Sequence, residues 1–395
     1  MTDARRHDED LRAVTELVVE AVLGVTTIAE DMHRTIGSGP AALGAPLARP
    51  ADLVTRVSYG AVKKVTGLVG ATLDRALATF GRVLGQSTPG PEREALLAAL
   101  NGVLGDQLAA RESALALPLR FRRRGGTSLD PASLAGPLGP RLLLLVHGSC
   151  MNDRQWRRAD HDHGEMMEAA GWTPVYVSYN SGRHVGDNGE ELAAALEKLV
   201  AAWPVPLTDL AFLAHSMGGL VSRSACHAAE AAGYAWRAKL RSMVFLGTPH
   251  HGAPLEKGGN GLDVLLGLQP VTAPLARLGK IRSAGVTDLR FGRVLTSEAR
   301  GRFEPGPDDR VPVPLPKDVR CGAVAGRLGA AKAGATRLSE LRGDGLVPVR
   351  SALGQHENPA FDLAMSERAT LEGLDHLALL SDPAVAETVR RSLVS

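Results

Sequence analysis

Short, continuously apolar runs that alternate with helical patterns constrain the fold of this chain more than any other feature. Beyond about residue 117, buried strands are predicted over 141–148, 173–180, 210–216, 240–249 and 319–326. Between them, residues 188–203 and 219–233 place apolar side chains at helical spacing. Strands that are apolar on both faces are typical of a parallel sheet covered by helices on both sides. We therefore expect an α/β fold with a mostly parallel sheet flanked by helices.

The chain is predicted to divide near residue 115. Residues 1–115 form an N-terminal helical region, with helices expected over 11–36, 52–84 and 91–115 between Gly- and Pro-rich breaks, and 116–395 form the α/β domain. The N-terminal helices either pack within the protein or contact a membrane or lipid surface, because residues 17–28 are apolar around most of the helix. Residues 253–316 lack a strand pattern, are rich in Leu, Val and Pro, and are predicted to form a cap or insertion.

Composition narrows the classes of partner and compartment. The net charge is +2, with 44% hydrophobic and 22% charged residues, and basic residues are scattered, which argues against nucleic-acid binding. The three cysteines are too few and too spread for a disulfide framework, and the charged start MTDARRHDED is unlike a signal peptide. We expect a cytoplasmic protein. The stretch DHDHGE (160–165) is interpreted as a solvated loop, and no metal or cofactor is predicted.

The stretch FLAHSMGGLVSR places Ser216 between a predicted strand and a predicted helix. A small residue, Ser216 and Gly218 at alternate positions are typical of a sharp turn that exposes a hydroxyl above a helix N-terminus. A serine hydroxyl becomes a useful nucleophile only beside an imidazole that a carboxylate orients. Asp344 follows the strand predicted over 319–326, and His376 lies further along the chain. The order Ser216, Asp344, His376 predicts a catalytic triad.

Acyl transfer also needs hydrogen-bond donors for an oxyanion. The backbone amide of Met217, the first residue after the turn, and that of Ser149, just after the strand over 141–148, are predicted to supply them. Cys150 is the second choice for this donor and is not expected to be a nucleophile. Substrate contacts are considered for four residues near predicted strand ends, for which shaping or bracing of loops is the alternative: Cys150, Arg183, His184 and His250.

The stretches LVHGSCMND, YNSGRH, LAHSMGGLVSR, FLGTPHHGAP, DGLVPVRSA and LDHLALL, taken in this order, resemble the α/β-hydrolase superfamily. The resemblance is to bacterial serine esterases and lipases akin to the GPI inositol-deacylase-like group. It implies an α/β-hydrolase fold, a Ser-His-Asp acyl-enzyme mechanism without metal or organic cofactor, and ester substrates. Ala214 replaces the usual glycine of the turn and is small enough to keep the packing.

The sequence therefore predicts a carboxylic-ester hydrolase of the esterase or lipase type that acts on a small-molecule or lipid ester. Two alternatives stay open. The same triad could transfer an acyl group to an alcohol, or the chain could be a lipid- or membrane-binding protein on a hydrolase scaffold. The physiological ester and the oligomeric state are not encoded in any motif of the chain.

Overall fold

In the computed structural model of this protein, the described residues are 90–253, 283–298, 308–329 and 343–394. From Glu94 onward, these residues belong to one compact unit. The helices expected over 11–36 and 52–84, and most of the insertion expected over 253–316, lie outside the described residues. None of the described helices is long and apolar enough to cross a membrane.

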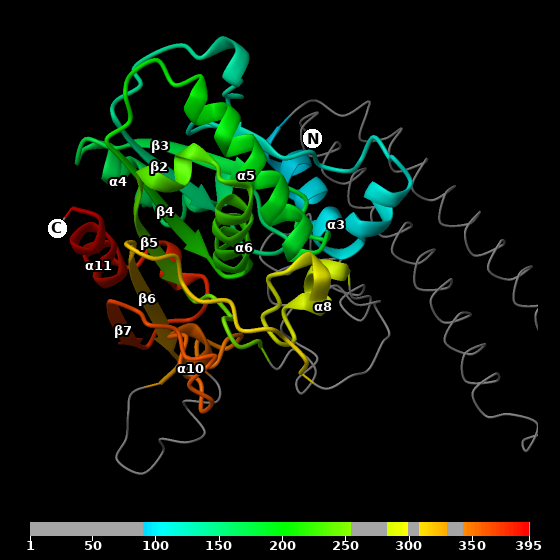
Figure 1. The fold of residues 1–395 in the computed structure, drawn as a ribbon, viewed down its shortest axis with the longest axis vertical. Helices are drawn as coiled ribbons and strands as arrows, with labels where there is room; N and C mark the ends of the chain where they lie inside the picture. The colour runs from blue at the N-terminus through cyan, green and yellow to red at the C-terminus, as the bar shows by residue number, and fades with distance from the viewer. Residues whose placement is uncertain (1–89, 254–282, 299–307, 330–342, 395) are drawn as a thin grey trace, which may run out of the picture. The chain divides into compact units, whose positions relative to one another are not determined.

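A seven-stranded sheet forms the centre of the unit, with the strand order β1-β3-β2-β4-β5-β6-β7 (Figure 1). Only β1 runs antiparallel to its neighbour β3, and the other pairings are parallel. The strands are β1 (Arg120–Arg122), β2 (Arg141–Val146), β3 (Thr173–Ser178), β4 (Asp209–His215), β5 (Leu240–Leu246), β6 (Arg320–Arg327) and β7 (Glu367–Glu372). The predicted α/β fold with a mostly parallel sheet is confirmed.

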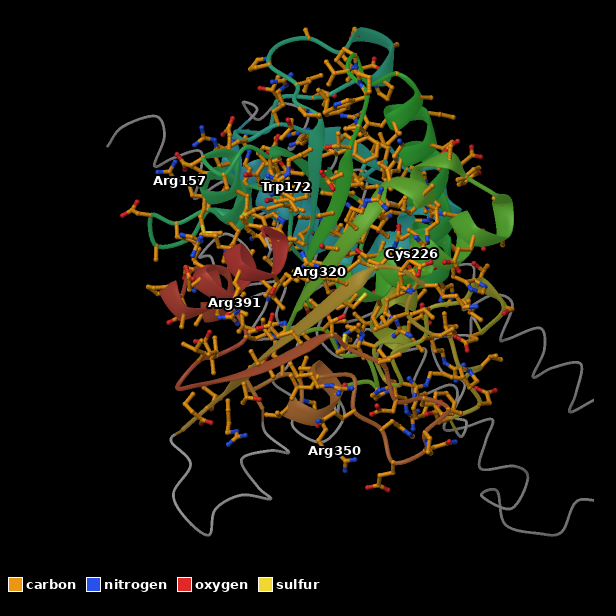
Figure 2. The ribbon with its side chains drawn as sticks, turned by 60° about the vertical axis from the view of Figure 1, so that its left-hand side comes forward. Arg157, Trp172, Cys226, Arg320, Arg350 and Arg391 are labelled. Atoms are coloured by element: carbon orange, nitrogen blue, oxygen red, sulfur yellow. The ribbon has the colours of Figure 1, made fainter. Side chains whose placement is uncertain are left out.

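Helices cover both faces of the sheet. The helices of the described residues are α3 (Pro91–Ala110), α4 (His163–Glu168), α5 (Val185–Ala201), α6 (Met217–Ala232), α8 (Ala284–Asp288), α10 (Val349–Ala352) and α11 (Pro383–Val394). Short 3₁₀ helices occupy Pro131–Ser133, Asp153–Trp156, Ala235–Lys239, Thr296–Glu298 and Ala378–Leu380. Helices α5 and α6 pack on each other, and Figure 2 shows Cys226 of α6 and Arg391 of α11 on opposite sides of the strands.

The apolar strands account for this two-sided packing. In β2, Leu142, Leu144 and Val146 contribute to the cluster that contains side chains of α5 and α6, whereas Leu143 and Leu145 alternate with them along the strand. All five side chains are fully buried. Since successive side chains of a strand point to opposite faces, a strand apolar at every position is stable only between two covering layers.

Helix α3 packs within the same compact unit and contacts the loop that follows β2. A Cβ atom added at Gly102 would lie 2.2 Å from Cys150 Sγ and 2.8 Å from its Cα. The Ser283 hydroxyl donates to the Gly102 carbonyl at 2.6 Å, and Asn180 Nδ2 donates to the Gly105 carbonyl at 2.9 Å. Glycine is therefore required where α3 meets this loop.

Gly102→Ala is expected to lower the free energy of unfolding, although alanine is the better helix former by about 1 kcal/mol. The added methyl group has to displace the backbone of Cys150, and such overpacking costs about 1–3 kcal/mol. Urea unfolding of the wild type and the variant measures the difference. A variant as stable as the wild type, or more stable, would mean that helix propensity outweighs packing at this contact.

Candidate active site

Ser216 lies between β4 and α6 in a backbone conformation that few L residues adopt. Its φ is 54° and its ψ is −126°. A positive φ at a residue other than glycine costs on the order of 1–3 kcal/mol and persists only where the surroundings hold it. Here the Ser216 amide donates to the Leu246 carbonyl at 2.8 Å, which ties the turn to the end of β5. The sharp strand-to-helix turn predicted at Ser216 is present.

Two glycines, Gly218 in the first turn of α6 and Gly148 in the loop after β2, let the Ser216 turn pack closely against the end of β2. A Cβ atom added at Gly218 would lie 2.2 Å from the Val146 carbonyl oxygen and 2.5 Å from that of His147. A Cβ atom at Gly148 would lie 2.9 Å from Ser216 Cβ. The backbone after β2 and the first turn of α6 are therefore in direct contact, with Ser216 between them.

Asp344 and His376 form a buried pair joined by two hydrogen bonds. His376 Nδ1 lies 2.7 Å from Asp344 Oδ2, and the His376 amide donates to the Asp344 carbonyl at 3.0 Å. Oδ1 of Asp344 accepts from the amides of Leu346 and Val347, at 3.0 and 2.8 Å. Both side chains are 2% exposed or less. The carboxylate therefore selects the tautomer with the proton on Nδ1, and the lone pair is on Nε2.

The Nε2 atom of His376 is buried and has no hydrogen-bond partner among the described residues. The chain on both sides of Ser216 reaches the same pair. His215 Nε2 lies 2.9 Å from the His376 carbonyl oxygen, and the two rings are 4.6 Å apart. Gly247 follows Leu246, and a Cβ atom there would lie 3.0 Å from Asp344 Oδ2 and 3.1 Å from His376 Cε1. The structure thus brings Ser216, Asp344 and His376 into one neighbourhood at the carboxyl ends of the parallel strands.

The residues predicted as oxyanion donors flank the same turn. Ser149 and Cys150 follow the end of β2 and are buried, and Met217 begins α6, where first-turn amides have no acceptor within the helix. The Cys150 amide donates to Ser181 Oγ at 3.0 Å, so this amide already has a partner. Burial raises the pKa of the Cys150 thiol to about 12, which keeps it protonated and unreactive near neutral pH.

Three residues considered for substrate contact have partners within the protein. Arg183 forms an ion pair with Glu191 of α5. His184 Nδ1 lies 3.0 Å from Asp288 Oδ2, and this hydrogen bond raises the pKa of His184. The His250 side chain is fully buried, packs edge-on against Phe245 and lies beside Arg223, and no contact between it and His376 is observed among the described residues.

The stretch 160–165, interpreted from sequence as a solvated loop, is exposed at Asp160 and Glu165 but buried from Asp162 to Gly164. Asp162 caps α4 by accepting from the Gly164 and Glu165 amides, and it also accepts from the Tyr176 hydroxyl at 2.7 Å. His163 is fully buried, with Nε2 3.2 Å from the Leu379 carbonyl oxygen. The solvated-loop interpretation is wrong for these two residues, because α4 packs them against β3 and the segment after His376. Within the described ranges, no group of three or more His, Cys, Asp or Glu residues could hold a metal ion.

Buried imidazoles lie around the candidate site. For two of them, His163 and His215, no functional role was predicted from the sequence. Burial lowers the pKa of His147 to about 4 and that of His163 to about 3, and it lowers the pKa of His215 well below the usual value. These rings are therefore neutral at pH 7. The only sequence signal at His215 is its position directly before Ser216.

Stability is expected to fall as the pH drops below about 6.5. An unfolded histidine takes up a proton near pH 6.5, whereas folded His147 stays neutral until about pH 4, so the unfolded state binds more protons between these values. Each such imidazole lowers the free energy of unfolding by up to about 1.4 kcal/mol per pH unit in that window. Urea unfolding at pH 7, 6 and 5 measures this slope above the range in which carboxylates titrate. Equal stabilities at pH 7 and pH 5 would contradict it.

The sheet order, the strained serine turn and the buried Asp344–His376 pair define an α/β-hydrolase fold. Residues 138–290 match the family model of the PGAP1-like alpha/beta domain, which is the part of the chain that carries β2 to β5 and the Ser216 turn. The resemblance stated from the sequence motifs is thereby confirmed.

Solved structures of lipases and esterases are among those similar to this chain. A lipase of Bacillus licheniformis in its mature form is 18% identical with a TM-score of 0.42, and the match covers 71% of this chain and 99% of the lipase. Aspergillus fumigatus lipase B is 14% identical with a TM-score of 0.39, and the match covers 64% of this chain and 54% of that lipase chain. An esterase of Pyrococcus furiosus is 13% identical with a TM-score of 0.40, and the match covers 69% of this chain and 88% of the esterase. No curated protein matches the sequence.

Proposed function

We propose that this protein is a serine hydrolase that cleaves carboxylic esters through an acyl-enzyme. The observation that carries the proposal is the buried Asp344–His376 pair, whose Nε2 has no partner, beside the strained turn at Ser216. A serine held in such a turn, a neutral imidazole and an orienting carboxylate are the components that acyl transfer from an ester needs. The match of residues 138–290 to the PGAP1-like alpha/beta domain supports the same class of chemistry.

In the proposed first half-reaction, Ser216 Oγ attacks the ester carbonyl carbon and His376 Nε2 takes the hydroxyl proton. Asp344 holds the proton on Nδ1 and stabilises the imidazolium that forms. The amides of Ser149 and Met217 donate to the oxyanion, a role that the engaged amide of Cys150 cannot share without losing Ser181. The carbon–oxygen bond to the alcohol then breaks, and His376 returns the proton to the leaving alkoxide.

In the second half-reaction, a water molecule attacks the acyl carbon while His376 Nε2 accepts its proton. Collapse of the second oxyanion breaks the bond between the acyl carbon and Ser216 Oγ, His376 Nε2 returns its proton to that oxygen, and the carboxylic acid is released. The cycle uses no metal and no organic cofactor. The proposed compartment is the cytoplasm, which the three buried cysteines, none of them in a disulfide, support.

Hydrolysis of p-nitrophenyl esters from acetyl to palmitoyl tests the proposal. We expect turnover of at least part of this series, and the chain length with the highest kcat/KM distinguishes an esterase from a lipase. A full-length, folded protein that hydrolyses none of these esters, with or without lipid vesicles, would contradict ester hydrolysis.

A further inference from the structure

Arg223 of α6 is a buried cation that forms no ion pair with any carboxylate of the described residues. Its side chain is buried, Nη2 donates to the Val313 carbonyl at 2.7 Å, and Nη1 lies 3.5 Å from His250 Nδ1. The Nε atom has no hydrogen-bond partner, and no carboxylate of the described part of the chain pairs with this guanidinium. Within the described residues, the guanidinium therefore has two neutral acceptors and no ion-pair partner, and Glu298 acts on it only from a longer distance.

A buried guanidinium in this state is costly. Burial lowers the pKa of Arg223 to about 10, so the group still carries its charge at neutral pH. A charge taken out of water without a paired opposite charge loses several kcal/mol of solvation. The nearby carboxylates are already engaged: Glu298 accepts the main-chain amides of Val294, Leu295 and Val311, and Asp308 forms a two-bond pair with Arg310.

A small cavity of about 20 Å³ adjoins Arg223. Its polar lining comes from Arg223, His250, His251, Arg310 and Glu298. Since His250 Nδ1 faces a guanidinium donor, the proton of this neutral ring belongs on Nε2. That buried Nε2 has no partner either, so two unpaired donors, Arg223 Nε and His250 Nε2, belong to residues that line the same cavity.

We propose that this cavity binds a single monatomic anion of the halide class, with chloride as the biological candidate, as the counter-ion of Arg223. A volume of this size holds one water-sized particle, so it fits a monatomic anion and is too small to enclose a whole phosphate or sulfate. The anion would neutralise the guanidinium and accept the two unpaired hydrogen bonds. It would also join α6 to the loop after β5, because Arg223 and His250 come from these two segments.

Thermal unfolding of the full chain at constant ionic strength tests the site independently of ester hydrolysis. Sodium chloride is titrated against sodium gluconate, whose anion is too large for the cavity. We expect the Tm to rise saturably with chloride by a few degrees, and to rise likewise with bromide. A Tm that is the same in both salts, or that changes without saturating, would overturn the proposal.

Arg223→Met removes the charge and keeps the aliphatic stem, so its Tm should no longer depend on chloride. Arg241→Met is the matched control, since Arg241 is more than half exposed, and it should keep the chloride response. Should Arg223→Met fail to fold, crystals of the wild type grown in sodium bromide provide the decisive measurement, with one anomalous peak expected beside Arg223 and His250. Water alone in the cavity, or a bromide peak without any chloride effect on the Tm, would overturn the proposal.

Discussion

Ser216→Ala is expected to lower kcat for p-nitrophenyl ester hydrolysis on the order of 10⁵- to 10⁶-fold, with little change in KM. In the proposed mechanism the hydroxyl oxygen forms the acyl-enzyme, and no neighbouring group is expected to replace it. Cys150, the nearby thiol, stays protonated because burial raises its pKa to about 12. Activity left in the variant should come only from binding and from the oxyanion donors.

Ser224→Ala is the control for this variant. Ser224 lies on α6, the helix that follows Ser216, is buried, and its hydroxyl is 3.5 Å from the Gly186 carbonyl oxygen. It should therefore show the effect of removing a buried hydroxyl from α6 without removing the nucleophile, and it should keep kcat within a few-fold. Comparable losses in both variants would mean that the Ser216 result reflects a disturbed helix, and activity retained by Ser216→Ala would remove Ser216 from the mechanism.

Asp344→Asn is expected to lower kcat by about 10⁴-fold while the fold is kept. An asparagine fits the same space, but its amide nitrogen can donate to His376 Nδ1. The imidazole would then carry its proton on Nε2, the atom that has to accept the Ser216 proton. The defect is therefore one of tautomer and charge, and circular dichroism and urea unfolding should show a native-like protein.

Asp375→Asn is the matched control for the carboxylate. Asp375 directly precedes His376, and its Oδ1 accepts from the amides of Leu377 and Ala378, at 2.9 and 2.7 Å. It therefore stabilises the local turn without reaching the imidazole nitrogen that pairs with Asp344. We expect its kcat to stay within a few-fold of the wild type. A larger loss of kcat in Asp375→Asn than in Asp344→Asn would mean that Asp375, and not Asp344, orients the imidazole.

The central strands could be predicted because both of their faces are buried, so β2 to β6 carry an unbroken apolar signal. Strand β7 could not. Its sequence, ERATLE, is polar and half-exposed, and it pairs only with β6 at the edge of the sheet. The strand exists because of that long-range pairing, which leaves no local pattern.

In the candidate site, too, contacts between distant segments leave no local sequence pattern. The Ser216 turn has a local motif, whereas the 2.7 Å contact between Asp344 and His376 depends on how two loops pack after β6 and β7. His250 was considered for substrate contact because it follows a predicted strand. Its ring is buried, packs against Phe245 and lies beside Arg223 of α6. Order along the chain identifies strand ends but not the direction in which a side chain leaves them.

The edge position of β7 separates the proposed catalytic residues between the edge and the centre of the sheet. His376 follows β7, the last strand of the sheet, while Ser216 and the predicted oxyanion donors Ser149 and Met217 follow strands near its middle. Edge elements open locally at lower free energy than central ones. Detachment of this one strand would move His376, the proposed base, away from an otherwise intact scaffold, so loss of the proposed ester hydrolysis on warming should precede loss of the sheet. The temperature at which turnover is lost therefore reports the detachment of β7 from the edge of the sheet.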